Sequence, residues 1–299
     1  MPGPLAATQQ PIVLACGIAR FDALRERFAA LLRWVDVELP DSGHSFRGIR
    51  SHLERHGFEV YHTHVSFAAK LATRATELGE QVESILNRSG ADQCHIIAHS
   101  MGGLDARRMI VGSPGLASRV SSLTTIGTPH HGTPVADRLL EEGLADWIET
   151  LRTAIDLEGL RDLGPSACEE FNRANEAAEA ANRVVYRTVW STALEVFRPL
   201  RGGAELMSEI ENDGLVPVKS QQWTTLLTGP AGSKEVQQIA FPFPADHLNQ
   251  LGWWGPSDFS APLAPLSALS EWKRRFRETE TRAKDFYLAL AKGLPGSPH

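Results

Sequence analysis

Short apolar runs alternate with amphipathic stretches along most of the chain. The apolar runs are bounded by turn-forming residues, as in strands, whereas the stretches between them repeat apolar residues at helical spacing. The expected strands cover residues 11–17, 58–62, 120–126, 184–190 and 237–241, and the expected helices residues 21–32, 49–56, 70–87 and 268–291. Because such alternation builds parallel sheets, the sequence predicts an α/β fold with a mostly parallel central sheet and helices on both faces.

The pattern changes between residues 133 and 182, where strand signals disappear and helical ones dominate. An amphipathic stripe in this stretch consists of Leu144, Trp147, Ile148, Leu151 and Ile155. We expect residues 133–182 to form a helical lid or cap insertion within a single domain that spans residues 1–299. The apolar face of such a lid would cover a site and make transient contact with a lipid surface. The same stripe is equally compatible with an ordinary helix packed on the core.

One further apolar run ends abruptly at a serine. Residues 95–104 read His-Ile-Ile-Ala-His-Ser-Met-Gly-Gly-Leu, which predicts an interior strand followed by a helix. Between them, Ala98, Ser100 and Gly102 match the nucleophile elbow G-x-S-x-G, with alanine at its first position. Small residues are needed there because the strand and helix backbones nearly touch. Ser100 is therefore expected to be a nucleophile at a helix N-terminus, where the helix dipole favours a developing negative charge.

A serine nucleophile needs a general base and a carboxylate that orients the base. Where this elbow occurs, the chain order is serine, then acid, then histidine. Of the 11 histidines, only His247 and His299 lie in the last quarter of the chain, and His299 ends a Gly/Pro tail. We therefore assign His247 as the base. Asp213, in an Asn-Asp-Gly turn, is the expected acid, and Asp246 is the rival acid beside the base in sequence.

Two backbone N–H groups are expected to form an oxyanion hole. One belongs to Met101, directly after the nucleophile. The other is expected in the loop after the first strand, and we assign it to Ile18. Because the backbone donates these hydrogen bonds, the two side chains are not constrained by this role.

Composition narrows the classes of partner. The 299 residues include 30 Lys and Arg against 36 Asp and Glu, with a net charge of −6 and no long basic run, which argues against a nucleic-acid partner.

The three cysteines lack metal-ligand spacing, and His130-His131 lies in a Gly/Pro loop, so we assign no metal and expect no cofactor. Residues 1–10 do not form a signal peptide and no window reaches transmembrane length, so the expected location is cytoplasmic.

These motifs, in this order, resemble the bacterial triacylglycerol lipases of family I within the α/β-hydrolase superfamily. The resemblance runs from Pro11 to about Gly252. The segments that carry it are FRGI (46–49), GEQV (79–82), IIAHSMGGL (96–104), LTTIGTPHHGT (123–133), NDGLVP (212–217) and DHL (246–248). It implies an α/β-hydrolase fold and hydrolysis of carboxylic esters, often lipid esters. It also implies Ser100 as nucleophile, His247 as base and Asp213 as acid.

The chain departs from the family pattern at three points. Cys16-Gly17 stands where the family usually has His-Gly, which changes the hydrogen bonding of that loop but leaves the backbone donor. The family's calcium site uses an aspartate shortly after the leucine that follows the catalytic histidine, and Asn249-Gln250 at this place argues against calcium. The family's secretion signal and disulfide pair are also missing. These departures indicate an intracellular or divergent esterase.

Three functions are compatible with these residues. The first is a serine carboxylic ester hydrolase, a lipase or esterase that cleaves acyl or lipid esters through an acyl-enzyme on Ser100. The second is an acyltransferase that passes the same acyl group to an alcohol. The third is a non-catalytic binding protein of the same fold, against which the complete set of serine, aspartate and histidine argues.

Overall fold

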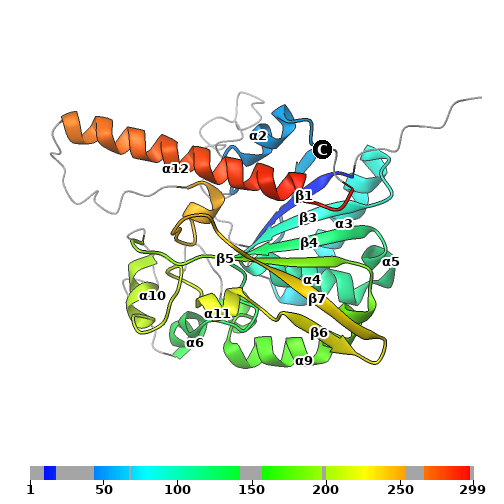
Figure 1. The fold of residues 1–299 in the computed structure, drawn as a ribbon. Helices are drawn as coiled ribbons and strands as arrows, with labels where there is room; N and C mark the ends of the chain where they lie inside the picture. The colour runs from blue at the N-terminus through cyan, green and yellow to red at the C-terminus, as the bar shows by residue number, and fades with distance from the viewer. Residues whose placement is uncertain are drawn as a thin grey trace, which may run out of the picture.

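The central sheet follows the predicted arrangement. The computed structural model describes residues 10–17, 44–66, 69–141, 157–196, 200–253 and 266–296. In this part of the chain seven strands form a sheet in the order β2-β1-β3-β4-β5-β7-β6, parallel throughout except for the β6–β7 hairpin (Figure 1). The strands are β1 (Ile12–Cys16), β2 (Val60–His62), β3 (Cys94–His99), β4 (Val120–Ile126), β5 (Val185–Trp190), β6 (Leu226–Gly229) and β7 (Gly232–Ala240).

Helices cover both faces of the sheet, as predicted (Figure 1). The helices α2 (Ile49–Arg55) and α12 (Leu266–Lys292) lie on one face, and α3 (Leu71–Ser89) and α4 (Met101–Gly112) on the other. The other helical segments are α5 (Pro114–Ala117), α6 (Pro134–Glu141), α8 (Leu157–Arg161), α9 (Pro165–Ala181), α10 (Arg201–Leu206), α11 (Val218–Gln221) and the 3₁₀ turn η3 (Asn249–Leu251). The helix predicted over residues 21–32 lies outside the described residues. None of the described helices combines the length and apolar character needed to cross a membrane.

Alternate residues of the central strands supply two apolar cores. In β3, Ile96 packs into the core beneath α3 and α4, whereas Ile97 packs into the core beneath α2 and α12. Every residue of β1 and β3 is buried, as expected for interior parallel strands covered on both faces. The register pairs Cys16 with His99 and His99 with Ile126. The strands β1, β3 and β4 therefore end at the same edge of the sheet, where ligands bind in open α/β sheets.

The far edge of the sheet differs from the prediction. The sequence pattern predicts a strand over 237–241, which covers only the C-terminal part of β7, and it does not predict β6. Both strands contain several exposed or half-exposed positions and β7 is largely polar, so they lack a clear apolar alternation. Pairing of β7 with the buried strand β5, from Val236 on Tyr186 to Ala240 on Trp190, brings this hairpin into the sheet.

The predicted lid range, 133–182, divides into two parts in the structure. Helix α9 packs against β6, β7 and α4, so this part is a crossover helix that covers the sheet (Figure 1). Helices α6 and α8 instead pack against each other. The amphipathic stripe from Leu144 to Ile155 lies outside the described residues, so a lid formed by that stretch stays a prediction.

Candidate active site

Ser100 occupies the turn between β3 and α4. Its φ of 57° and ψ of −135° lie in a region that non-glycine residues rarely adopt. The neighbouring strand β4 and its following loop hold this conformation, because the Ser100 N–H donates to the Ile126 carbonyl at 2.9 Å and Thr128 Oγ1 donates to the Ser100 carbonyl at 2.8 Å. The strained turn thus sets the serine at the carboxyl edge of the sheet.

Glycines let the strand, the helix and the adjoining loops approach closely at this turn. A Cβ atom at Gly102 would lie 2.9 Å from the Ala15 carbonyl oxygen, and one at Gly17 would overlap the backbone nitrogen of Gly102. A Cβ at Gly103 would overlap the Thr128 side chain. Because real Cβ atoms essentially never come within 3.0 Å of such neighbours, a larger residue would force the backbone apart. The predicted need for small residues around the serine is confirmed at Gly102.

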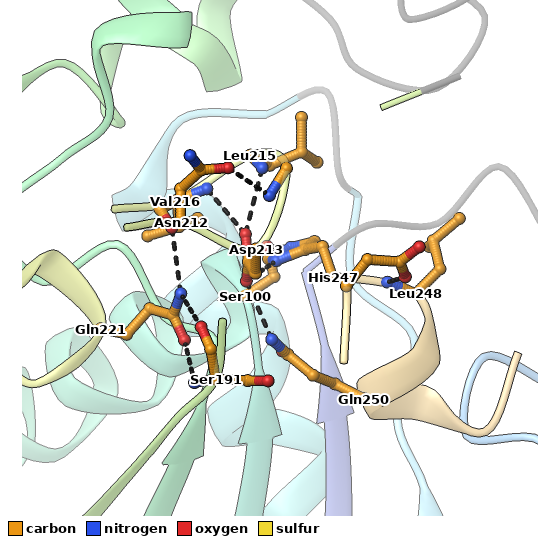
Figure 2. Close-up of polar contacts among 12 residues, drawn as sticks. Ser100, Ser191, Asn212, Asp213, Leu215, Val216, Gln221, His247, Leu248 and Gln250 are labelled. Carbon is orange, nitrogen blue, oxygen red and sulfur yellow. Dashed lines mark hydrogen bonds and ion pairs between the residues drawn. The ribbon is translucent and has the colours of Figure 1, made fainter. Parts of the chain in front are cut away.

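Ser100, His247 and Asp213 come from three distant parts of the sequence and form one hydrogen-bonded line (Figure 2). Ser100 Oγ lies 2.8 Å from His247 Nε2, and His247 Nδ1 lies 2.7 Å from Asp213 Oδ2. Ser100 is 4% exposed, and the other two side chains are fully buried. Because a carboxylate only accepts, Nδ1 carries the imidazole proton and Nε2 is left to accept the serine hydroxyl. This arrangement can activate a serine as a nucleophile.

Asp213 is fixed by the turn in which it lies. Its Oδ1 accepts the N–H groups of Leu215 at 3.1 Å and Val216 at 2.8 Å, an Asx-type turn. The His247 N–H donates to the Asp213 carbonyl at 2.9 Å, which joins the two loops. The rival acid, Asp246, instead accepts two backbone N–H groups in its own turn with Oδ1. The carboxylate that contacts the imidazole is therefore that of Asp213.

Two buried side chains to which the sequence analysis gave no role in catalysis extend this network. Gln250 Nε2 donates to Asp213 Oδ2 at 2.9 Å, and Gln250 Oε1 lies 3.2 Å from His99 Nε2. The His99 ring lies against the His247 ring, with 4.6 Å between ring centroids. Burial, followed by the nearby His247, lowers the pKa of His99 well below its ordinary value, so its imidazole is neutral. A glutamine in a loop gave no sequence signal for this contact.

Of the two backbone N–H groups predicted for the oxyanion hole, only that of Met101 lies in the part of the chain that the structure describes. Met101 begins α4 directly after Ser100 and lines the same pocket. Its N–H belongs to the first turn of the helix, where backbone N–H groups lack intrahelical acceptors. Gly17, the residue before Ile18, also lines this pocket. Ile18 itself lies outside the described residues, as does His299, so the two-donor oxyanion hole stays a prediction.

An apolar pocket begins at Ser100 and His247. It encloses about 480 Å³ of space, part of which is open to solvent. Aliphatic side chains from α6, α8 and the segments that follow α8 and Asp213 form most of its wall, namely Val135, Ala136, Leu139, Leu160, Leu163, Leu215 and Val216. Among the described residues that line it, none is Asp, Glu, Lys or Arg. Such a pocket fits an apolar group attached to the atom that reacts at Ser100.

The residues beside the base do not fit the calcium site that the resemblance implies. Calcium takes several oxygen ligands, with carboxylates prominent among them. Here the Gln250 amide is bonded to Asp213 and His99, and Asn249 Nδ2 donates to the Trp253 carbonyl at 2.7 Å. In the part of the chain that the structure describes, no group of three or more His, Cys, Asp or Glu residues is arranged to hold a metal ion. Cys16, Cys94 and Cys168 are buried thiols.

Comparisons with known proteins agree with this arrangement. The family model of the alpha/beta hydrolase fold matches residues 39–201. A triacylglycerol lipase of Pseudarthrobacter phenanthrenivorans is 35% identical over 135 residues, which are 44% of this chain and only 37% of that protein. Triacylglycerol lipase 2 of Saccharomyces cerevisiae is 25% identical over 259 residues, which are 83% of this chain and 72% of that protein. The mature Bacillus licheniformis lipase BlEst2 has a TM-score of 0.59 at 18% identity, over 82% of this chain and 88% of that one.

The matched family model spans more than half of the chain and includes the whole turn around Ser100. The structural similarity to the Bacillus licheniformis protein shows a shared fold. The parallel sheet covered by helices on both faces and the strained serine turn after β3 are consistent with both findings. The chain therefore belongs to the alpha/beta hydrolase fold family.

Proposed function

We propose that this protein is a serine carboxylic ester hydrolase, a lipase or esterase, that works through an acyl-enzyme on Ser100. The observation that carries the proposal is the line of two short hydrogen bonds, from Ser100 Oγ to His247 Nε2 and from His247 Nδ1 to Asp213 Oδ2, beside an apolar pocket. The similarity to proteins named triacylglycerol lipase supports the same class of reaction.

The geometry supports a two-step reaction. Ser100 Oγ attacks the ester carbonyl carbon while His247 Nε2 takes the hydroxyl proton, and the Asp213 carboxylate stabilises the resulting imidazolium. The imidazolium then gives this proton to the leaving alcohol oxygen, and the acyl group stays on Ser100. Water, which loses a proton to His247, attacks the acyl carbon. The bond from this carbon to Ser100 Oγ then breaks, His247 returns the proton to Oγ, and the carboxylic acid is released. In both steps the oxyanion accepts hydrogen bonds from the N–H groups of Met101 and Ile18.

The wall of the pocket favours esters with an apolar acyl chain. Burial of one CH₂ group contributes about 0.8 kcal/mol to binding, and the aliphatic lining offers no charged partner to a polar acyl group. We therefore propose acyl or lipid esters as the substrate class. Transient contact with a lipid surface belongs to the same proposal.

Replacement of the serine tests the proposal. In Ser100→Ala, hydrolysis of p-nitrophenyl esters should fall by roughly a thousandfold or more, because the nucleophile is lost. The unfolding temperature should stay near that of the wild type. Turnover is measured by release of p-nitrophenol. Adding an alcohol distinguishes the two reactions, because hydrolysis gives a carboxylic acid and acyl transfer gives a new ester.

Ser122→Ala is the matched control. Ser122 is also buried and has its Oγ 2.8 Å from a histidine nitrogen, His95 Nδ1, but it lies within β4, away from the pocket. This variant should keep its esterase activity. Full turnover by Ser100→Ala, or equal loss in both variants, would contradict the proposed role of Ser100.

A further inference from the structure

The Gln250 side chain is fully buried between two residues of the candidate site. Its amide nitrogen lies 2.9 Å from Asp213 Oδ2 and its amide oxygen 3.2 Å from His99 Nε2 (Figure 2 shows the contact with Asp213). Because a carboxylate accepts and does not donate, the NH₂ group must face Asp213, and the carbonyl oxygen then faces His99. The neutral imidazole of His99 donates from Nε2 to this oxygen. The amide is thus held at both ends in one orientation.

The backbone around Gln250 supports the same orientation. The Gln250 carbonyl accepts the hydroxyl of Tyr287 at 2.9 Å, which ties η3 to α12. The Gln250 N–H donates to the Asp246 carbonyl at 3.1 Å. Gly127, at a φ of 57°, leaves the space that the Gln250 amide fills, because a Cβ there would overlap Oε1. The segment that contains Gln250, α12 and the residue after β4 therefore meet at this residue.

The contact bears directly on the orientation of the imidazole. Asp213 Oδ2 is shared by His247 Nδ1 at 2.7 Å and Gln250 Nε2 at 2.9 Å, while Oδ1 is held by the backbone of its turn. Among the described residues, His247 is the only other one whose side chain bonds to Oδ2, so without Gln250 no further contact would hold this oxygen in place. The carboxylate would also become a stronger acceptor for the imidazole N–H, because one donor no longer draws on its charge.

We propose that Gln250 is a positioning residue for ester hydrolysis, whose amide fixes the Asp213 carboxylate that in turn orients His247. The proposal rests on the proposed serine hydrolase function. It adds a residue that does not touch the substrate and acts through the acid alone.

Gln250→Met tests this role, because methionine has a similar length and no donor. The kcat/KM for a p-nitrophenyl ester should fall about tenfold, mainly through kcat, since a hydrogen bond to a charged group is lost. The acid limb of the pH profile of kcat/KM should move to higher pH by about half a pH unit. The His247 imidazole becomes more basic because Asp213 Oδ2 no longer accepts a second hydrogen bond from Gln250. If Gln250→Met does not fold, Gln250→Asn serves instead, because its shorter amide leaves the same contact unmade and should move the limb in the same direction.

Gln221→Met is the matched control. Gln221 is equally buried and makes comparable amide contacts, but with the backbone of Ser191 and Val216 and not with the Asp213 carboxylate (Figure 2). This variant should lower the unfolding temperature and leave the acid limb in place. An unchanged acid limb in a folded Gln250 variant, or the same movement in Gln221→Met, would overturn the positioning role. If the wild type shows no turnover that depends on Ser100, the proposed function fails as well, so the two failures are distinguishable.

Discussion

The serine turn leaves no room for one additional methyl group at Gly103. A Cβ there would overlap the Thr128 side chain, whose Oγ1 holds the Ser100 carbonyl. Gly103→Ala should therefore lower the free energy of unfolding by about 2 kcal/mol, the usual cost of overpacking. It should also reduce esterase activity, because the helix that carries Met101 moves relative to the strand. Urea-induced unfolding and p-nitrophenyl ester turnover measure the two effects.

Gly112→Ala, in the same helix, is the control for this substitution. No atom lies within 4 Å of a Cβ built at Gly112, and its φ is not in the left-handed region. Alanine at this position should leave activity unchanged and raise the free energy of unfolding by about 0.5 kcal/mol, because it restricts the unfolded chain. Equal stability of the two variants would contradict the packing argument for Gly103.

Single residues differ in how far the sequence reveals their part in the site. Ser100 was predictable because a nucleophile elbow has a fixed pattern, and His247 and Asp213 followed from chain order and turn chemistry. Their convergence, with Asp213 rather than Asp246 on the imidazole, is a tertiary result that the structure supplies. Gln250 was not predictable, because its contact depends on how η3 packs against the turn of Asp213.

The sequence predicted helices and strands most accurately where they are most deeply buried. The strands β1 and β3 were predicted because short apolar runs mark interior parallel strands. The strands β4 and β5 were predicted because they are rich in β-branched and aromatic residues. The polar hairpin of β6 and β7 was only partly predicted, because its position depends on pairing with β5. The lid range also included α9, which packs on β6 and β7, and a helical pattern alone does not say which surface a helix covers.

Buried imidazoles on β3 and in the loop that follows β4 make stability depend on pH. Burial lowers the pKa of His95 to about 4 from an ordinary value of 6.5, and His99 and His130 shift in the same direction, also mainly through burial. Below pH 6.5 the unfolded chain binds protons that the folded chain excludes, so stability falls as pH falls. At pH 5 the loss from His95 alone should be about 2 kcal/mol. Asp105, whose pKa burial raises to about 7, contributes in the opposite sense.

Urea-induced unfolding at pH 7.5 and pH 5 measures this dependence. His95→Gln should make the loss of stability between the two pH values smaller by about 2 kcal/mol, because glutamine does not titrate and can still bond to Ser122. Because Asp105 acts in the opposite sense, the comparison of the variant with the wild type carries the test. A variant whose pH dependence matches that of the wild type would contradict the assignment of His95 as a neutral, buried imidazole.

At the scale of the whole molecule, the fold brings the side chains of Ser100, Asp213 and His247, which are far apart in the sequence, to one edge of a sheet. Treatment with a fluorophosphonate, followed by peptide mass mapping, tests most directly whether they act together. In the wild type we expect a single adduct, on Ser100. In His247→Ala this adduct should form more than about a hundredfold more slowly, because the serine is no longer activated. No adduct on Ser100 in the folded wild type, or labelling at the same rate in His247→Ala, would contradict the proposal that these residues act together.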